Sequence, residues 1–170
     1  MIKAQFFGEE ILSNSKEAFS LYEKSRFGEK KRNKIKYSLV EALFLKITNK
    51  MEVFSINKNL TEEQLFRKIK RIDKRIDIKL PVFSDMREKG HILKTALKFG
   101  AEFRVYKKGI KPGKDHALWL LYPVKESENH SWYDFAAKNR VANSTKKKLL
   151  IGIVDDEEDV SYYEISWLKP

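Results

Sequence analysis

One segment of this 170-residue sequence holds several residue types that can do acid–base chemistry close together. Tyr106 is followed by a basic stretch with two glycines, residues 107–115, and then by His116. Tyrosine, histidine and lysine side chains can move protons and stabilise negative charge. A histidine in a loop is more commonly an ordinary polar surface residue, however, so this spacing by itself does not identify a catalytic site.

Several other classes of site are disfavoured by what the sequence lacks. Without cysteine there can be no disulfide, thiolate zinc site, iron–sulfur cluster or cysteine nucleophile. The nucleotide-binding patterns GxGxxG and GxxxxGKS/T and the serine-hydrolase pattern GxSxG are absent. The three histidines, His91, His116 and His130, have no close metal-ligand spacing. We therefore expect neither a cofactor nor a metal site.

The chain is strongly basic, with 35 lysines and arginines against 24 acidic residues and a net charge of +11. This charge favours a polyanionic partner such as nucleic acid or an anionic membrane surface, although a merely solvated basic surface would have the same composition. No apolar run reaches the roughly 20 residues that span a bilayer. The N-terminus also lacks the apolar core of a signal peptide. We expect a cytoplasmic protein that does not use a membrane.

Five acidic residues nevertheless follow one another near the end of this basic chain. They are Asp155, Asp156, Glu157, Glu158 and Asp159. Consecutive acids on one tight turn cannot all converge on a single cation, and no EF-hand pattern is present. A metal-dependent nuclease is therefore disfavoured, and the concentration of negative charge in one segment needs another explanation.

The first half of the chain predicts an N-terminal α+β domain of helices and antiparallel strands, residues 1–76. Ser38 with Glu41 and Thr61 with Gln64 have capping-box spacing, which marks two helix starts. The other expected elements are a hairpin over 2–12, a helix over 15–26, a polar basic loop over 29–36 and an exposed strand over 51–56.

The helix that begins at Thr61 has a basic side and must end before Pro81. Its apolar residues are Leu65, Ile69, Ile72 and Ile76. Its other faces carry Arg67, Lys68, Lys70, Arg71, Lys74 and Arg75. This basic row is either an RNA-facing stripe or a solvated helix face, because Asp73 and Asp77 can pair with lysine or arginine along the helix.

The second half, residues 77–170, predicts a C-terminal α/β domain with a mixed sheet, so the whole chain is α+β or α/β. The expected strands cover 91–97, 102–107, 117–124, 149–154 and 160–168. The expected helices cover 81–89 and 131–143. The segment LLIGIV (149–154) is the most apolar of these and should be an internal strand.

Beyond these patterns, the sequence resembles the archaeal-type tRNA-splicing endonucleases, or tRNA-intron lyases, over nearly its whole length. In the first half the similar segments are LYEKSRFGE (21–29) and SLVEALFL (38–45). In the second half they are LKFGAEFRVYKKGIKPGKDHALWLLY (97–122), RVANSTKKKLLIGIVDDEEDVSYYEI (140–165) and the closing WLKP. The resemblance implies that the C-terminal domain is restriction-endonuclease-like.

The resemblance also implies which residues act. It assigns catalysis to Tyr106, His116 and a lysine within residues 146–148, of which the spacing from His116 favours Lys147. It assigns RNA binding to Arg140 and to Trp167. Members of the family cut precursor tRNA at bulge–helix–bulge motifs without a metal ion, leaving 2′,3′-cyclic phosphate and 5′-hydroxyl ends.

In such a reaction Tyr106 would take the proton of the attacking 2′-hydroxyl, or would only orient that hydroxyl. The first role requires nearby cations to lower its pKa, because a free tyrosine has a pKa of about 10. His116, as the group that titrates nearest neutrality, suits the general acid. Lys147 suits the stabilisation of charge on the phosphate oxygens.

The resemblance gives the acidic run 155–159 a purpose as well. In the family this loop inserts into a basic cleft of another subunit, so we expect a homotetramer, with a heterotetramer containing a second subunit as the alternative. Two rival functions remain: a non-catalytic RNA-binding or structural subunit of such an assembly, and a metal-dependent restriction-type DNA nuclease. The second rival needs a carboxylate cluster at the sheet, which the sequence does not offer outside residues 155–159.

Overall fold

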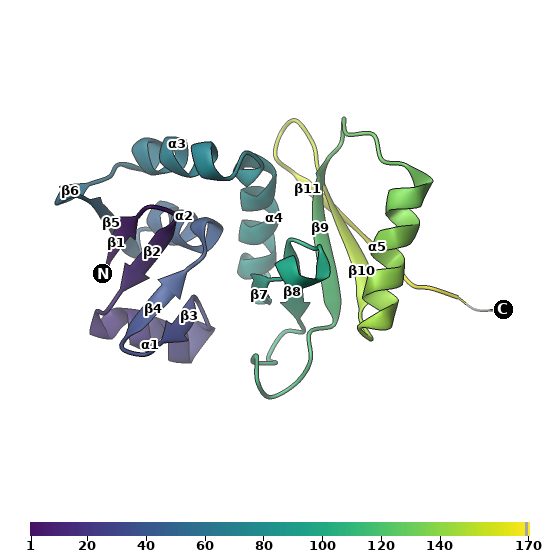
Figure 1. Cartoon of the computed structure of the whole chain (residues 1–170), viewed down its shortest axis with the longest axis horizontal. Helices are drawn as coiled ribbons and strands as arrows, with labels where there is room; N and C mark the ends of the chain where they lie inside the picture. Colours follow the sequence, from purple (N-terminus) through teal and green to yellow (C-terminus); the bar gives the residue numbers. More distant parts are fainter. Residues whose placement is uncertain (169) are drawn as a thin grey trace. The chain divides into compact units, whose positions relative to one another are not determined.

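The chain forms two compact units, Met1–Leu80 and Pro81–Pro170, in a computed structural model that describes residues 1–168 and Pro170. Each unit contains one mixed β-sheet (Figure 1). The fold is α+β, as the sequence predicts, with the α/β arrangement in the C-terminal unit. In the described part of the chain, no helix is long and apolar enough to cross a membrane.

The N-terminal sheet has the strand order β3-β4-β2-β1-β5-β6. Its strands are β1 (Ile2–Phe7), β2 (Glu10–Ser13), β3 (Glu29–Lys31), β4 (Lys34–Tyr37), β5 (Met51–Ser55) and β6 (Lys58–Asn59). The hairpin of β1 and β2 is confirmed, but the prediction of antiparallel strands throughout is wrong, because β1 and β5 run parallel. The strand predicted over 51–56 is confirmed as β5, but the prediction that it is exposed is wrong. Met51 and Val53 are buried, on the face of β5 that packs inside the unit.

Residues 29–36, predicted as a polar loop, instead form most of the β3–β4 hairpin. The hairpin forms because Ile35, the one apolar residue of the segment, is fully buried. Gly28 enters the hairpin with φ +75, and a Cβ at this position would lie 2.9 Å from the Lys36 carbonyl oxygen. Only glycine allows this close approach of the two backbones.

Three helices of the N-terminal unit begin where the sequence predicts. They are α1 (Lys16–Ser25), α2 (Leu39–Ile47) and α3 (Glu62–Ile72). Both capping boxes form, Ser38 with Glu41 and Thr61 with Gln64. Glu41 is buried and its Oε1 also accepts the backbone N–H of Gly28 at 2.9 Å. The cap of α2 therefore also anchors the start of the β3–β4 hairpin.

The helix that begins after Thr61 ends before Pro81, as predicted, but the prediction that it carries Ile76 is wrong, and so is the prediction of a new helix that starts at Pro81. Helix α3 stops at Ile72, and α4 (Ile76–Glu88) contains both Ile76 and Pro81. Between them the Arg75 N–H donates to Asp73 Oδ1 at 3.0 Å, a local bond that competes with continuation of α3. Pro81 has no N–H to bond the carbonyl of residue 77 and its ring crowds that carbonyl, yet α4 continues past it to Glu88.

The C-terminal sheet has the order β11-β10-β9-β8-β7. Its strands are β7 (Ile92–Thr95), β8 (Phe103–Tyr106), β9 (Trp119–Lys125), β10 (Lys148–Val154) and β11 (Val160–Ile165). Strands β9 and β10 are parallel and the other neighbours antiparallel. The apolar segment 149–154 lies in β10 and is internal, as predicted. The predicted strand over 160–168 ends early, at Ile165.

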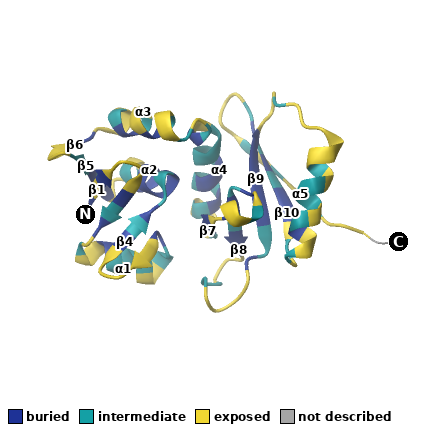
Figure 2. Cartoon of the chain, in the orientation of Figure 1, coloured by how far each residue is buried: buried dark blue, intermediate teal, exposed yellow. Residues whose placement is uncertain are grey.

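A helix packs on each face of this sheet. Helix α5 (Trp132–Ser144) contributes Ala142 to a buried cluster with Leu149 of β10. On the other face Val82 of α4 lies so close to β10 that a Cβ on Gly152 would be 3.2 Å from it. Figure 2 shows that buried residues concentrate in β9 and β10. This enclosed sheet provides rigid strand ends for the side chains described next.

Candidate active site

A pocket of about 390 Å³ in the C-terminal unit brings the three predicted catalytic residues together. Tyr106, His116 and Lys147 line it, together with Arg104, Lys114 and Asp115. The three predicted residues come from the end of β8, from the loop before β9 and from the turn before β10. These three residues lie at the ends of neighbouring strands of one sheet. Tyr106 and Lys147 therefore line a single cavity although they are 41 positions apart along the chain.

Tyr106 is the last residue of β8 and its side chain is almost completely buried. Its backbone is held by His91, whose Nδ1 lies 3.0 Å from the Tyr106 carbonyl oxygen. The His91 ring in turn meets the Trp119 ring edge to face, with the ring centres 5.6 Å apart. These contacts fix the strand end from which the phenol enters the pocket.

His116 lies in the loop between β8 and β9 and is exposed. The Asp115 carboxylate does not reach its ring but accepts its backbone N–H at 2.7 Å. The imidazole has no hydrogen-bond partner among the residues that the structure describes. A histidine held by its backbone, with both ring nitrogens available, can exchange a proton with a ligand.

The three consecutive lysines at the start of β10, residues 146–148, lie in three different environments. Lys147 lines the pocket, with Nζ 2.9 Å from the Thr145 carbonyl oxygen and 5.5 Å from the centre of the Phe99 ring. Lys148 points elsewhere and forms an ion pair with Glu164 at 2.5 Å. Lys146 is exposed and has φ +56. Lys147 is therefore the only one of the three that lines this cavity.

Arg104 is a residue of the pocket that the sequence reasoning missed. It precedes Tyr106 by two positions in β8, so strand alternation puts both side chains on the same face. Its buried Nε has no hydrogen-bond partner within the described part of the chain. Burial lowers the pKa of the Lys147 ammonium, and the charge of Arg104 lowers it further. In the sequence, Arg104 could be noticed only as a basic residue two positions before Tyr106.

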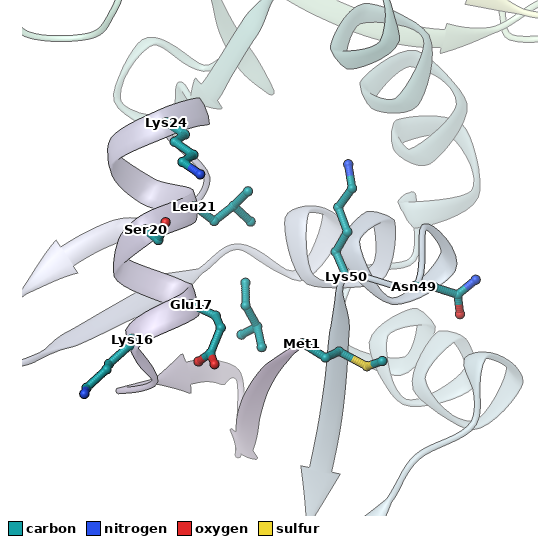
Figure 3. Close-up of a pocket in the computed structure, with 9 residues that line it drawn as sticks. Met1, Lys16, Glu17, Ser20, Leu21, Lys24, Asn49 and Lys50 are labelled. Carbon is teal, nitrogen blue, oxygen red and sulfur yellow. The ribbon is translucent and has the colours of Figure 1, made fainter.

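A larger pocket, about 660 Å³, lies in the N-terminal unit and offers no comparable acid–base set. Figure 3 shows its basic side chains, with Lys16 and Lys24 on α1 and Lys50 directly before β5. Its lining contains no histidine or tyrosine. Among the described residues, no group of three or more histidine, aspartate or glutamate side chains could hold a metal ion.

Two family models match this chain. One, described as the N-terminal domain of tRNA intron endonuclease, matches residues 2–66, and the other, described as the catalytic C-terminal domain, matches residues 76–162. The chain belongs to the tRNA intron endonuclease family. It is an endonuclease, and its membership of this family supports the cleavage of tRNA introns as its activity.

Similar full-length proteins agree with this assignment. The tRNA-splicing endonuclease of Nanoarchaeum equitans is 44% identical over 138 residues, which cover 78% of this chain and 88% of that protein. The tRNA-splicing endonuclease of Pyrococcus abyssi is 39% identical over 170 residues, covering 99% and 98% of the two chains. That of Thermococcus onnurineus is 37% identical over 169 residues, covering 99% and 97%. The resemblance noted in the sequence is confirmed.

In this tRNA intron endonuclease the two predicted RNA-binding residues lie outside the pocket. Arg140 is exposed on α5 and has no ion-pair partner in the part that the structure describes. Trp167 follows β11 and is 56% exposed. No contact joins Arg140 to Trp167 within the described residues. Both planar side chains are therefore open to a ligand.

The acidic segment 155–159 forms the tight turn between β10 and β11 of the endonuclease. Asp155 is turned inward, and its Oδ1 accepts the backbone N–H groups of Glu157 and Asp159, both at 2.9 Å. The other four residues are exposed. Asp156 is within 3.2 Å of the Lys125 ammonium. One carboxylate therefore shapes the turn, while the remaining four extend into solvent at its tip.

Proposed function

We propose that this chain is the catalytic subunit that excises introns from precursor tRNA at bulge–helix–bulge motifs, by a reaction that needs no metal ion. The observation that carries the proposal is the convergence of Tyr106, His116 and Lys147 on one pocket. In the reaction the 2′-oxygen attacks the adjacent phosphorus and the bond to the 5′-oxygen breaks. The products are a 2′,3′-cyclic phosphate and a 5′-hydroxyl.

Each of the three groups has a step in this reaction. Tyr106 accepts the proton of the 2′-hydroxyl when the phenol is ionised; in the alternative, the neutral phenol orients that hydroxyl and the proton passes to water. His116 in its protonated form donates a proton to the leaving 5′-oxygen. Lys147 stabilises the negative charge that develops on the nonbridging oxygens of the phosphorane. Arg104 adds a second cation for the same phosphate, because it lines the pocket with Lys147 and its charge acts on that lysine.

Recognition of the bulge uses the two exposed planar side chains outside the pocket. Unpaired RNA bases are bound by stacking on aromatic rings and guanidinium planes. Trp167 and Arg140 offer one plane of each kind. The role assigned to them is to hold one bulge nucleotide between the two planes.

The substrate has two bulges, so the working enzyme needs two active sites at a fixed separation. We propose that the chain assembles as a homotetramer in which the exposed tip of the 155–159 turn enters a basic cleft of another subunit. The exposure of four carboxylates on a chain of net charge +11 supports this role. The alternative assembly is a heterotetramer with a second, non-catalytic subunit. The alternative function is that this chain is itself a non-catalytic RNA-binding or structural subunit of a heteromeric enzyme.

The deciding experiment uses the purified chain and a bulge–helix–bulge RNA in excess EDTA. We expect cleavage at both junctions with cyclic phosphate ends. Cleavage that appears only when magnesium is added would contradict the mechanism. Cleavage that appears only after a partner subunit is added would replace the homotetramer with the heteromeric alternative.

Arg104 gives a prediction about Lys147 that does not depend on catalysis. Replacing it in the variant Arg104→Gln should move the Lys147 pKa upward, because one of the two causes that lower it is removed. The pKa is measured by NMR titration of the Lys147 side chain. Lys98→Gln removes the same charge from an exposed position outside the pocket and should leave the titration unchanged. Equal titration curves for Arg104→Gln and the unaltered protein would show that the two cations do not interact.

A further inference from the structure

A groove in the N-terminal unit, about 500 Å³ in volume, combines exposed apolar side chains with two cations. The end of β1, the turn between β5 and β6 and the last turns of α3 form it. These segments meet because β1 and β5 pair in parallel up to Gln5 and Phe54, which brings Phe7 and Ile56 to the same end of the sheet. Figure 2 shows exposed residues along α3 and at the β5–β6 turn.

The apolar part of the groove is unusually open to solvent. Phe7 is 61% exposed and Ile56 is 94% exposed, and Ile72 lies beside them at the end of α3. Ile56 also has φ +47, a conformation that is costly for a β-branched residue. Large apolar side chains gathered at one exposed place are typical of a binding surface.

The cations of the groove come from α3 and are distinct from the ion-paired cations of that helix. Lys68 lies 3.3 Å from Ser55 Oγ and 5.7 Å from the centre of the Phe6 ring. Arg71 has no hydrogen-bond or ion-pair partner within the described residues. By contrast, Arg67 pairs with Glu63, and Lys70 pairs with Asp77 at 2.6 Å. The basic row of α3 is thus partly an ion-paired solvent face and partly the wall of this groove.

We propose that this groove binds an unpaired segment of the RNA substrate, with a base stacked on Phe7 and its neighbouring phosphates held by Lys68 and Arg71. The proposal rests on the proposed function, since it assigns a second contact for the same RNA. Proteins bind single-stranded RNA by combining aromatic platforms with cations that follow the backbone. The groove has both parts, and no acidic residue lines it.

A protein partner fits the groove less well. The centre of a protein interface is depleted of lysine, whereas Lys68, which has no carboxylate partner among the described residues, lies beside the apolar residues of this groove. The charge of the unit points the same way, because the N-terminal half holds more basic than acidic residues. Charge complementarity therefore favours a polyanion over an apolar peptide or a second copy of the chain.

The test measures binding of precursor tRNA whose attacking 2′-hydroxyls are replaced by hydrogen, so that no cleavage occurs. Phe7→Ala should weaken binding by about 5- to 150-fold, the effect of losing one stacked base. The double variant Lys68→Gln, Arg71→Gln should lower the slope of log affinity against log salt by about 1.4, since each phosphate contact in single-stranded RNA contributes about 0.7. All three positions are exposed, and thermal unfolding checks that each variant folds.

Arg67→Gln is the matched control, because it removes one charge from the same helix outside the groove. It should leave both affinity and salt slope unchanged. Unchanged RNA binding in Phe7→Ala and in the double variant would overturn the proposal, and so would a changed oligomer mass in light scattering with RNA affinity intact, which would identify a protein interface. Failure of the unaltered chain to cleave would instead contradict the proposed function, so the two failures are distinguishable.

Discussion

His116→Ala is expected to lower the rate of RNA cleavage by about 10²- to 10⁴-fold, the usual contribution of a positioned general acid. His116 lines the same pocket as Tyr106 and Lys147, and its ring has no partner among the described residues. The side chain is exposed, so its loss should leave the fold intact. Single-turnover cleavage of bulge–helix–bulge RNA measures the effect.

A change of leaving group separates a general acid from a structural histidine. When sulfur replaces the bridging 5′-oxygen, the leaving thiolate needs no proton, so His116→Ala should cut this substrate at nearly the rate of the unaltered enzyme. His130→Ala is the control, because His130 is equally exposed but lies outside the pocket, 3.4 Å from Glu128. If the sulfur substrate does not rescue the His116 variant, the acid role is wrong.

Local signals in the sequence predicted the helix starts well, because caps are made within a few residues. Ser38 with Glu41 and Thr61 with Gln64 form the bonds that their spacing indicates. The pairing of β1 with β5 could not be predicted in this way, since it joins segments almost fifty residues apart. The β3–β4 hairpin was missed because only burial of Ile35 against the rest of the unit distinguishes it from a polar loop.

For the candidate site, too, local features could be predicted from the sequence and long-range contacts could not. Tyr106 and His116 could be singled out by type, but only the family resemblance joined them to Lys147. The parallel pairing of β9 and β10 supplies that reason, because it sets Lys148 beside Trp119 and so brings the turn before β10 to the loop before β9. Strand alternation places Arg104 on the same face of β8 as Tyr106. It was missed because a cation in a strand of a basic chain carries no distinguishing mark.

Neutralising the tip of the acidic turn is expected to split the proposed tetramer into dimers, halving the mass seen by light scattering. The variant carries Asp156→Asn, Glu157→Gln, Glu158→Gln and Asp159→Asn. Asp155 is kept, because its carboxylate accepts two backbone N–H groups that shape the turn. The variant is more basic than the unaltered chain, so a simple charge effect would strengthen RNA binding.

We nevertheless expect this variant to cleave a two-bulge substrate about 10²-fold more slowly, because the second active site is no longer held at a high effective concentration. A control with the same charge change uses four exposed acids elsewhere, Glu9→Gln, Glu29→Gln, Glu88→Gln and Glu126→Gln. It should stay tetrameric. Raising the salt concentration should mimic the turn variant in the unaltered enzyme, since screening weakens an exposed acidic tip in a basic cleft. Intact tetramers of the turn variant at low salt would show that these four carboxylates do not hold the assembly together.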